Sequence, residues 1–120
     1  MKIFLTGGTG FIGSHFINEA IAKNIQLVCL KREKSRPRIA LNTQPLWVVG
    51  QLDDNLDAQL QGCDILVHLA SHTSNVPYDS LENCLYWNLT APLKLLQSAK
   101  KVGINKFVII SNMINTFRKI

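Results

Sequence analysis

The 120-residue sequence contains no long hydrophobic run. A membrane-spanning helix needs about 20 consecutive apolar residues, and no stretch approaches that length. The apolar segment between Lys2 and Gly7 is also too short for the core of a signal peptide. Cysteine is scarce, with three residues at no metal-ligand spacing, which favours free thiols in a reducing compartment over a metal site. We therefore expect a cytoplasmic protein with no membrane partner and no metal.

Acidic residues are the second deficit, since 13 lysines and arginines outnumber 8 aspartates and glutamates and give a net charge of +5. A basic balance raises the question of nucleic acid, but the sequence lacks the pattern of aromatic and basic residues typical of that partner. Much of the positive charge lies instead in residues 31–38, and such a run is usually a solvated loop. The 47% hydrophobic content indicates one globular domain, and we expect no nucleic-acid partner.

Short apolar segments bounded by turn residues recur along the chain, as is typical of strands buried in a parallel sheet. They are residues 3–5, 26–30, 46–49, 65–70 and 107–110. Between the first two, apolar residues repeat at helical spacing from Ile12 to Ile21, and Asn24 is expected to end that helix. This alternation predicts an α/β fold, a doubly wound parallel sheet with strand order 3-2-1-4-5. His68, in the fourth segment, is interpreted as a histidine packed in the core.

A longer helical pattern covers residues 81–101, between the fourth and fifth strands. Its spacing predicts one packed side, formed by Leu85, Leu89, Leu93, Leu96 and Ala99. Pro92 interrupts the pattern and should kink the helix or mark a break. Gly103 is a natural C-terminal cap.

A glycine-rich segment joins the first strand to the first helix and reads Thr6-Gly7-Gly8-Thr9-Gly10-Phe11-Ile12-Gly13. A tight turn needs a residue free to adopt positive φ, which fits Gly7. A pyrophosphate must approach the backbone closely, which fits Gly10, and the helix must pack tightly on the strand, which fits Gly13. The helix N-terminus then offers N–H groups and a partial positive charge to phosphates. The alternative is an ordinary strand-to-helix turn, but the flanking strand and helix favour a dinucleotide site.

With this motif the sequence resembles the NAD(P)-dependent epimerase/dehydratase family, the extended short-chain dehydrogenases/reductases. The family fingerprint Thr-Gly-x-x-Gly-x-x-Gly is met residue for residue, and residues 64–70 and 106–111 are similar to the family's fourth and fifth strands. The resemblance implies a Rossmann fold over residues 1–112 that binds NAD(P). It implies cofactor contacts at Gly7, Thr9, Gly10, Phe11, Ile12, Gly13, Leu69, Ala70, Ser71 and Asn88.

Two departures from the family pattern lie at the adenosine end. NAD-using members carry an acidic residue after the second strand for the ribose hydroxyls, where this sequence has Lys31 followed by Arg32. Such cations would pair with a 2′-phosphate, so we expect a preference for NADP over NAD, the alternative being a merely solvated loop. After the third strand the family often has Gly-Asp-Leu, and here Gln51 replaces the aspartate before Leu52. Its amide can still hydrogen-bond near the adenine.

Two further departures concern catalysis. Ser111 and Asn112 stand at the end of the fifth strand, which is the active-site strand of the family, and Asn112 replaces the usual catalytic serine or threonine. The catalytic Tyr-x-x-x-Lys is missing, because neither Tyr78 nor Tyr86 is followed by lysine at the required spacing. Residues 113–120 do not continue as in family members. We therefore expect a fold truncated after the fifth strand, with a non-family tail and no C-terminal substrate region.

Two kinds of function remain open. In the first, the chain is the cofactor half of a sugar-nucleotide epimerase, dehydratase or reductase, inactive by itself and able to use a nucleotide-sugar substrate only if the missing C-terminal part is supplied. In the second, it is a stand-alone dinucleotide-binding module, acting as a sensor or as a subunit of a larger assembly. The fifth strand would also leave an apolar sheet edge at residues 107–110, so we expect a homo-oligomer.

Overall fold

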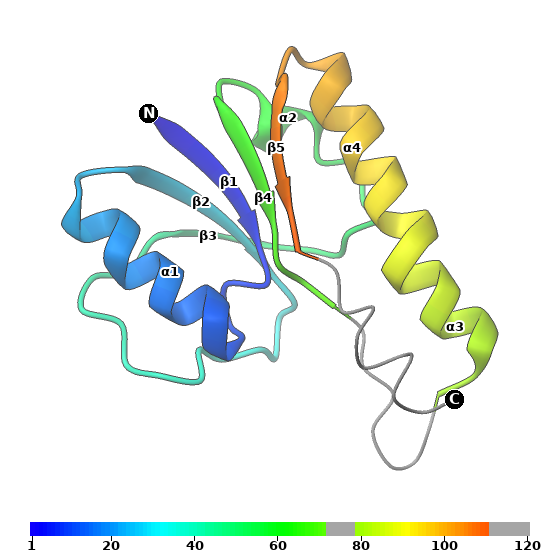
Figure 1. Cartoon of the computed structure of the whole chain (residues 1–120), viewed down its shortest axis with the longest axis horizontal. Helices are drawn as coiled ribbons and strands as arrows, with labels where there is room; N and C mark the ends of the chain where they lie inside the picture. Colours follow the sequence, from blue (N-terminus) through cyan, green and yellow to red (C-terminus); the bar gives the residue numbers. More distant parts are fainter. Residues whose placement is uncertain (72–78, 111–120) are drawn as a thin grey trace.

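The computed structural model describes residues 1–71 and 79–110. Five parallel strands form one sheet in the order β3-β2-β1-β4-β5 (Figure 1). The strands are β1 (Lys2–Thr6), β2 (Gln26–Lys31), β3 (Leu46–Val49), β4 (Ile65–His68) and β5 (Lys106–Ile109). The helices are α1 (Phe11–Ala22), α2 (Asp57–Leu60), α3 (Leu81–Leu85), the π-helical η1 (Tyr86–Thr90) and α4 (Ala91–Lys101). This order confirms the predicted doubly wound sheet.

Helices cover both faces of the sheet (Figure 1). On the α1 face, Leu5 and Ile17 belong to one buried cluster. On the face of α2 and α4, Phe4, Leu60 and Leu95 belong to a second. Neighbouring strand residues point to opposite faces, so Phe4 and Leu5 serve different clusters. The central strands are therefore buried on both sides, which is why they read as continuous apolar runs. No helix in the described ranges is long and apolar enough to cross a membrane.

Two polar side chains lie inside the sheet where β1 and β4 end. The Thr6 hydroxyl oxygen is 2.6 Å from Nδ1 of His68, and both residues are buried. The Ala70 N–H donates to the same hydroxyl oxygen, which leaves the hydroxyl hydrogen available for His68. Burial lowers the pKa of His68, which favours the neutral ring. His68 is therefore a core histidine with a hydrogen-bond partner, as predicted.

Residues with positive φ follow the two main helices. Asn24 (φ 61°) follows α1, and the next N–H donates back to the Ala20 carbonyl. Gly103 (φ 101°) follows α4, and the next N–H donates back to the Ala99 carbonyl. This combination of a left-handed residue and a backward hydrogen bond is typical of helix C-termini. Both predicted helix ends are confirmed.

The helical segment over residues 81–101 changes type along its length, from α3 through η1 to α4. Leu85, Leu89 and Leu93, which were predicted to pack, are 51–55% exposed. The buried residues of α4 are instead Ala91, Pro92, Leu95 and Ala99. The prediction was wrong for Leu93 because residues two apart in an α-helix point to nearly opposite sides, and Leu95 is the buried one. It was wrong for Leu85 and Leu89 because each hydrogen-bonded ring of the π turn holds one extra residue, which rotates them relative to the buried side of α4. Pro92 lies at the start of α4, directly after the π-helical turn, so the predicted kink or break appears as a change of helix type in a continuous helical segment.

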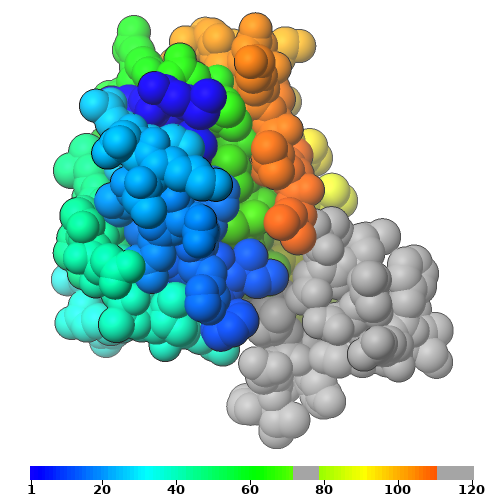
Figure 2. Space-filling model, turned by 60° about the vertical axis from the view of Figure 1, so that its left-hand side comes forward, coloured from blue at the N-terminus to red at the C-terminus, as the bar shows by residue number. Residues whose placement is uncertain are grey.

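β5 lies at the edge of the sheet with all of its residues exposed. Phe107 is 37% exposed, and Val108, Ile109 and Ile110 are 50% exposed each. Figure 2 shows this orange strand at the surface beside the green atoms of β4. Among the described residues no strand pairs with its outer side, so an apolar edge faces outward.

Candidate functional site

The glycine-rich turn connects β1 to α1 in a compact loop. Gly7 has φ +78°, a left-handed conformation that favours glycine, and its carbonyl accepts a hydrogen bond of 3.1 Å from the Gly10 N–H. Ser14 in α1 donates from its hydroxyl to the Gly8 carbonyl at 3.0 Å and from its N–H to the Gly10 carbonyl at 2.9 Å. The turn is therefore fixed both by the strand and by the helix.

Two of its glycines leave no room for a side chain. A Cβ atom at Gly7 would lie 2.5 Å from the Ala70 nitrogen, just beyond β4. A Cβ atom at Gly13 would fall on the Gly7 carbonyl oxygen. α1 can approach the turn this closely only because residue 13 is glycine. Both positions therefore serve the packing of helix against strand.

Gly10 differs, because no protein atom fills the place of its missing side chain. Outside its chain neighbours, the nearest atom to an added Cβ is the Gly7 carbonyl oxygen at 3.4 Å, which is an ordinary contact. Its φ of −71° and ψ of 172° suit any residue. The fold does not require a glycine at this position. A phosphate that binds close to the backbone does require one, because a side chain would block its approach. α1 begins at the next residue without an acidic side chain in its first turn, so its positive end is not neutralised.

A cavity of about 740 Å³ lies at this carboxyl edge of the sheet. Its wall comprises the glycine turn, the loop after β2, the segments that follow β3 and β4, and one residue of η1. The predicted cofactor residues that line it are Gly7, Thr9, Gly10, Phe11, Ile12, Gly13, Lys31, Arg32, Gln51, Leu52, Leu69, Ala70 and Ser71. Separate parts of the sequence therefore meet at one cavity, as expected for the switch point of a doubly wound sheet.

One predicted site residue within the described ranges does not line this wall, and two others lie outside those ranges. Asn88 is exposed in η1 and does not line the cavity, whereas its neighbour Trp87 does. Consecutive helix residues point in different directions around the axis, so only one of the two faces the cavity. Ser111 and Asn112 lie outside the described residues, just after Ile110, which does line the cavity.

The cavity also has lining residues that the sequence did not single out, among them Ser35, Arg36, Arg38 and Trp87. The basic run 31–38 indicated that arginines lie near the site, but a loop without periodicity does not tell which of them turn inward. Trp87 had no signal beyond its place beside Asn88.

The basic loop is held against the glycine turn by its own backbone. The Arg38 N–H donates to the Thr9 carbonyl at 3.0 Å. The Lys31 Nζ atom lies 3.3 Å from the carbonyl oxygens of both Glu33 and Ser35. This ammonium group therefore ties the loop together, and two of its three N–H donors are already used within the protein.

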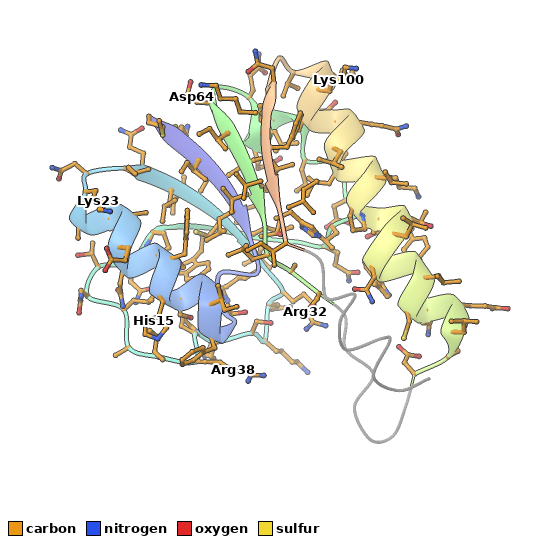
Figure 3. All side chains as sticks on the ribbon, in the orientation of Figure 1. His15, Lys23, Arg32, Arg38, Asp64 and Lys100 are labelled. Carbon is orange, nitrogen blue, oxygen red and sulfur yellow. The ribbon has the colours of Figure 1, made fainter. Side chains whose placement is uncertain are left out.

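Arg32, Arg36 and Arg38 extend from this loop and line the cavity. Within the described part of the chain, none of their side chains forms an ion pair or a hydrogen bond. In Figure 3, Arg32 lies below the carboxyl ends of the strands and Arg38 below the start of α1. Guanidinium groups bind phosphate oxygens with paired hydrogen bonds, so this side of the cavity is suited to a phosphorylated ligand.

Tyr86 has a lysine partner that a search for Tyr-x-x-x-Lys does not find. Its hydroxyl donates to Asp53 Oδ2 at 2.7 Å, and Lys94 Nζ lies 3.4 Å from the same hydroxyl oxygen. None of these three residues lines the cavity. The cluster joins η1 to the segment after β3 and does not present a proton-transfer pair to a ligand.

The cysteines and the possible metal ligands among the described residues do not support thiol or metal chemistry at this site. Burial raises the pKa of Cys29 to about 12, and it also raises the pKa of Cys63. Both thiols therefore stay protonated at neutral pH. In the described ranges, no group of three or more His, Cys, Asp or Glu residues is arranged to hold a metal ion. The cavity itself offers backbone donors, cations and apolar surface.

A glycine turn leading into a helix N-terminus, at the carboxyl edge of a doubly wound sheet, defines a nucleotide-binding Rossmann domain. Comparison with known proteins identifies the family. The model of the NAD dependent epimerase/dehydratase family matches residues 3–112. The chain belongs to this family.

The chain is similar to reductases and epimerases that are considerably longer. It is 38% identical over 112 residues to a "Putative dihydroflavonol 4-reductase" of Synechocystis sp., and the match covers 92% of this chain and 32% of that protein. The UDP-glucose 4-epimerase of Thermotoga maritima, solved with UDP-glucose, has a TM-score of 0.78 and 26% identity over 91% of this chain and 37% of its own. The UDP-glucose 4-epimerase of Stenotrophomonas maltophila, solved with NAD and formylated UDP-arabinopyranose, has a TM-score of 0.77 and 22% identity over 91% and 36%. The chain thus spans about a third of each of these relatives.

Proposed function

We propose that the cavity binds NAD(P) and that the chain is the cofactor-binding part of an epimerase, dehydratase or reductase that acts on a nucleotide-linked sugar. The observation that carries the proposal is Gly10, a glycine without a side-chain neighbour at the start of α1 and at the cavity wall. Membership of the NAD dependent epimerase/dehydratase family and the UDP-sugar epimerases among the structural neighbours support it.

The residues present fit a dinucleotide. The N–H groups at the start of α1 would receive the pyrophosphate at Gly10. The loop after β2 would receive the adenosine ribose, Gln51 and Leu52 would lie near the adenine, and residues 69–71 would line the rest of the cofactor. When bound, the nicotinamide ring supplies hydride transfer, and the chain's own residues bind and orient it.

We further propose a preference for NADP. Lys31 stands where NAD-binding members carry an acidic residue, and Arg32 and Arg36 line the same part of the cavity wall without a partner in the described ranges. Because the Lys31 ammonium is used by two loop carbonyls, the arginines carry most of the attraction for a 2′-phosphate. Calorimetric titration tests the preference, with tighter binding of NADPH than of NADH expected. Equal or reversed affinities would overturn it.

The 120-residue chain by itself is proposed to bind without turnover. The sequence has no Tyr-x-x-x-Lys, and Tyr86 with Lys94 does not line the cavity. Incubation with nucleotide sugars and either cofactor should give no product, and substrate use would require the C-terminal part that the longer relatives carry. Epimerase or reductase activity abolished by a substitution in this chain would contradict the proposal. Without such a part, the same cavity would serve a stand-alone dinucleotide-binding module.

Two further proposals concern assembly and location. The exposed apolar edge of β5 favours a homo-oligomer, since unpaired strand edges associate with other strands. All three cysteines are free thiols, which favours a reducing compartment such as the cytoplasm.

A further inference from the structure

One side chain of α1 holds the loop that contains the arginines. Asn18 donates from Nδ2 to the Ala40 carbonyl at 3.1 Å, and its Oδ1 accepts from the Asn42 N–H at 3.0 Å. An amide offers both a donor and an acceptor, so it can bond two backbone groups of one segment. Leu41, between these two partners, packs against the buried cluster on the α1 face. Residues 40–42 are therefore attached to α1, which the loop passes on its way from β2 to β3 (Figure 1).

The same side of α1 also holds the glycine turn. Ser14 lies one helical turn before Asn18 and donates from its hydroxyl to the Gly8 carbonyl at 3.0 Å. Ile17, between these two residues, is fully buried, so α1 itself is packed on the sheet. α1 thus supports two parts of the cavity wall, the turn through Ser14 and the basic loop through Asn18. The separation of these two parts is set by one helix.

The arginines lie in a part of the loop without regular secondary structure. Residues 32–45, all of which the structure describes, form no helix or strand. The Arg38 N–H donates to the Thr9 carbonyl, but a single hydrogen bond contributes little net stability. The Asn18 contacts begin two residues after Arg38, and both Arg36 and Arg38 line the cavity. These contacts therefore limit how far the arginines can move from the glycine turn.

A binding loop that is ordered before the ligand arrives loses less conformational entropy on binding. We propose that Asn18 is a positioning residue for the phosphate-binding arginines, which holds Arg36 and Arg38 where the 2′-phosphate of NADP binds. Asn18 does not line the cavity, so it acts through the loop and not on the ligand. The inference rests on the proposed function and on its preference for NADP, and its experiments separate the three.

Cofactor selectivity provides the first test. Asn18→Ala removes both hydrogen bonds to the loop, and alanine suits a helix. The variant should weaken NADPH by roughly three- to tenfold, the range expected when one or two side chains must be immobilised on binding, and NADH by less than about twofold. An unchanged ratio of the two affinities would overturn the inference, whether or not both affinities fall.

Glu19→Ala is the matched control for this test. Glu19 is the next residue of α1, is exposed and does not line the cavity. The variant should leave the ratio of the NADPH and NADH affinities unchanged. A change equal to that of Asn18→Ala would overturn the inference, because the effect would then belong to any substitution on this part of α1.

A combined variant tests whether Asn18 acts through the arginines. Arg36→Gln/Arg38→Gln lacks the charged groups that Asn18 is proposed to position. Adding Asn18→Ala to this variant should cause no further loss of NADPH affinity relative to NADH, since the effects of residues that act together are not additive. A full additive loss would give Asn18 only a general structural role.

Hydrogen exchange tests the ordered loop in the wild-type chain and needs no variant. The Asn42 amide should be protected without ligand, because it is bonded to Asn18. NADPH should add little protection to residues 39–43. Protection that arises only with NADPH would overturn the inference.

The outcomes separate the proposals. If the folded wild-type chain binds no dinucleotide, the proposed function and the inference are both wrong. If it binds NADPH and NADH equally, the NADP preference and the inference are wrong while the dinucleotide site stands. If it prefers NADPH and Asn18→Ala keeps the same preference, only the inference is wrong.

Discussion

The carbonyl oxygen of Gly7 occupies the space that a side chain at Gly13 would need. The end of β1 and the start of α1 are thereby in direct backbone contact, so the turn cannot relax without moving the helix. Gly10 has no such neighbour closer than 3.4 Å. One short motif therefore contains glycines required by the fold and a glycine that the fold itself does not require.

Alanine substitutions should separate these two kinds of glycine. Gly13→Ala should destabilise the fold by about 1–3 kcal/mol or more, because the new methyl group overlaps a backbone carbonyl that can move only with α1. Gly10→Ala should change the free energy of unfolding by less than about 1 kcal/mol, because its backbone conformation suits alanine. Urea unfolding measures both. Equal destabilisation would show that the packing difference between the two glycines has no energetic consequence.

Stability should fall in mild acid because of His68. Its pKa is lowered by burial, so the unfolded chain takes up this proton at a higher pH than the folded chain does. The contribution of His68 to the free energy of unfolding is therefore fully present above its unfolded-state pKa of about 6.5, and it is lost as the pH falls below that value. Protonation at Nδ1 would also remove the acceptor for the Thr6 hydroxyl. Urea unfolding at about pH 7 and about pH 5 measures the loss.

His68→Gln provides the comparison for this pH dependence. The variant should be less stable than the wild type at neutral pH, because it disturbs a buried hydrogen bond to Thr6. Its stability should nevertheless change less between the two pH values than that of the wild type. An identical acid-induced loss in both proteins would assign the effect to other groups.

Cofactor selectivity should depend on the arginines that line the cavity. Arg36→Gln should weaken NADPH roughly tenfold or more while changing NADH little, since a hydrogen bond between charged groups contributes about 1.5–3 kcal/mol. Lys34→Gln removes the same charge from the same loop, but Lys34 does not line the cavity. Its effect should be small and should vanish at high salt. Parallel titrations of both cofactors measure the difference. Equal losses of NADPH affinity in the two variants would show that the loop contributes only non-specific positive charge.

The free edge of β5 should mediate self-association. The Ile110 N–H donates to the His68 carbonyl in β4, and successive N–H groups of a strand alternate in direction. The Ile109 N–H therefore faces the free edge. Ile109→Pro or Ile109→Lys should shift the chain toward monomer in sedimentation velocity without removing a hydrogen bond to β4.

The opposite sheet edge supplies the control for this prediction. Leu46 in β3 is 64% exposed, so Leu46→Lys places a comparable charge on the other edge strand. Dissociation by Leu46→Lys alone would place the interface at β3. A wild-type chain that is monomeric at micromolar concentrations would contradict the proposed oligomer.

Much of the fold could be predicted because its signals are local. The central strands are continuous apolar runs, since helices cover both of their faces, and right-handed crossovers then restrict the strand order. Gly7 and Gly13 could be assigned because a turn and a close helix–strand contact each exclude a side chain. The ends at Asn24 and Gly103 follow from residues that tolerate positive φ.

The unpredicted features depend on long-range contacts or on irregular backbone. The π turn rotates Leu85 and Leu89 relative to the buried side of α4, and Leu93 lies opposite the buried Leu95, so the pattern of these three leucines indicated the wrong packed side. The choice between Arg36 and Lys34 as a lining residue depends on how an aperiodic loop folds. Trp87 reaches the cavity through a turn held by the contact of Tyr86 with Asp53, a pair that no local spacing reveals.

The central claim is that the open space at Gly10 receives the phosphates of a dinucleotide. The most direct measurement is calorimetric titration of NADPH and NADH into the wild-type chain and into Gly10→Val, with thermal unfolding of both proteins to establish that they are folded. The account predicts that the wild type binds, and that Gly10→Val keeps its unfolding transition but loses binding, because the valine side chain fills the approach to the backbone. A folded wild-type chain that binds neither cofactor, or a Gly10→Val variant that binds as tightly as the wild type, would contradict it.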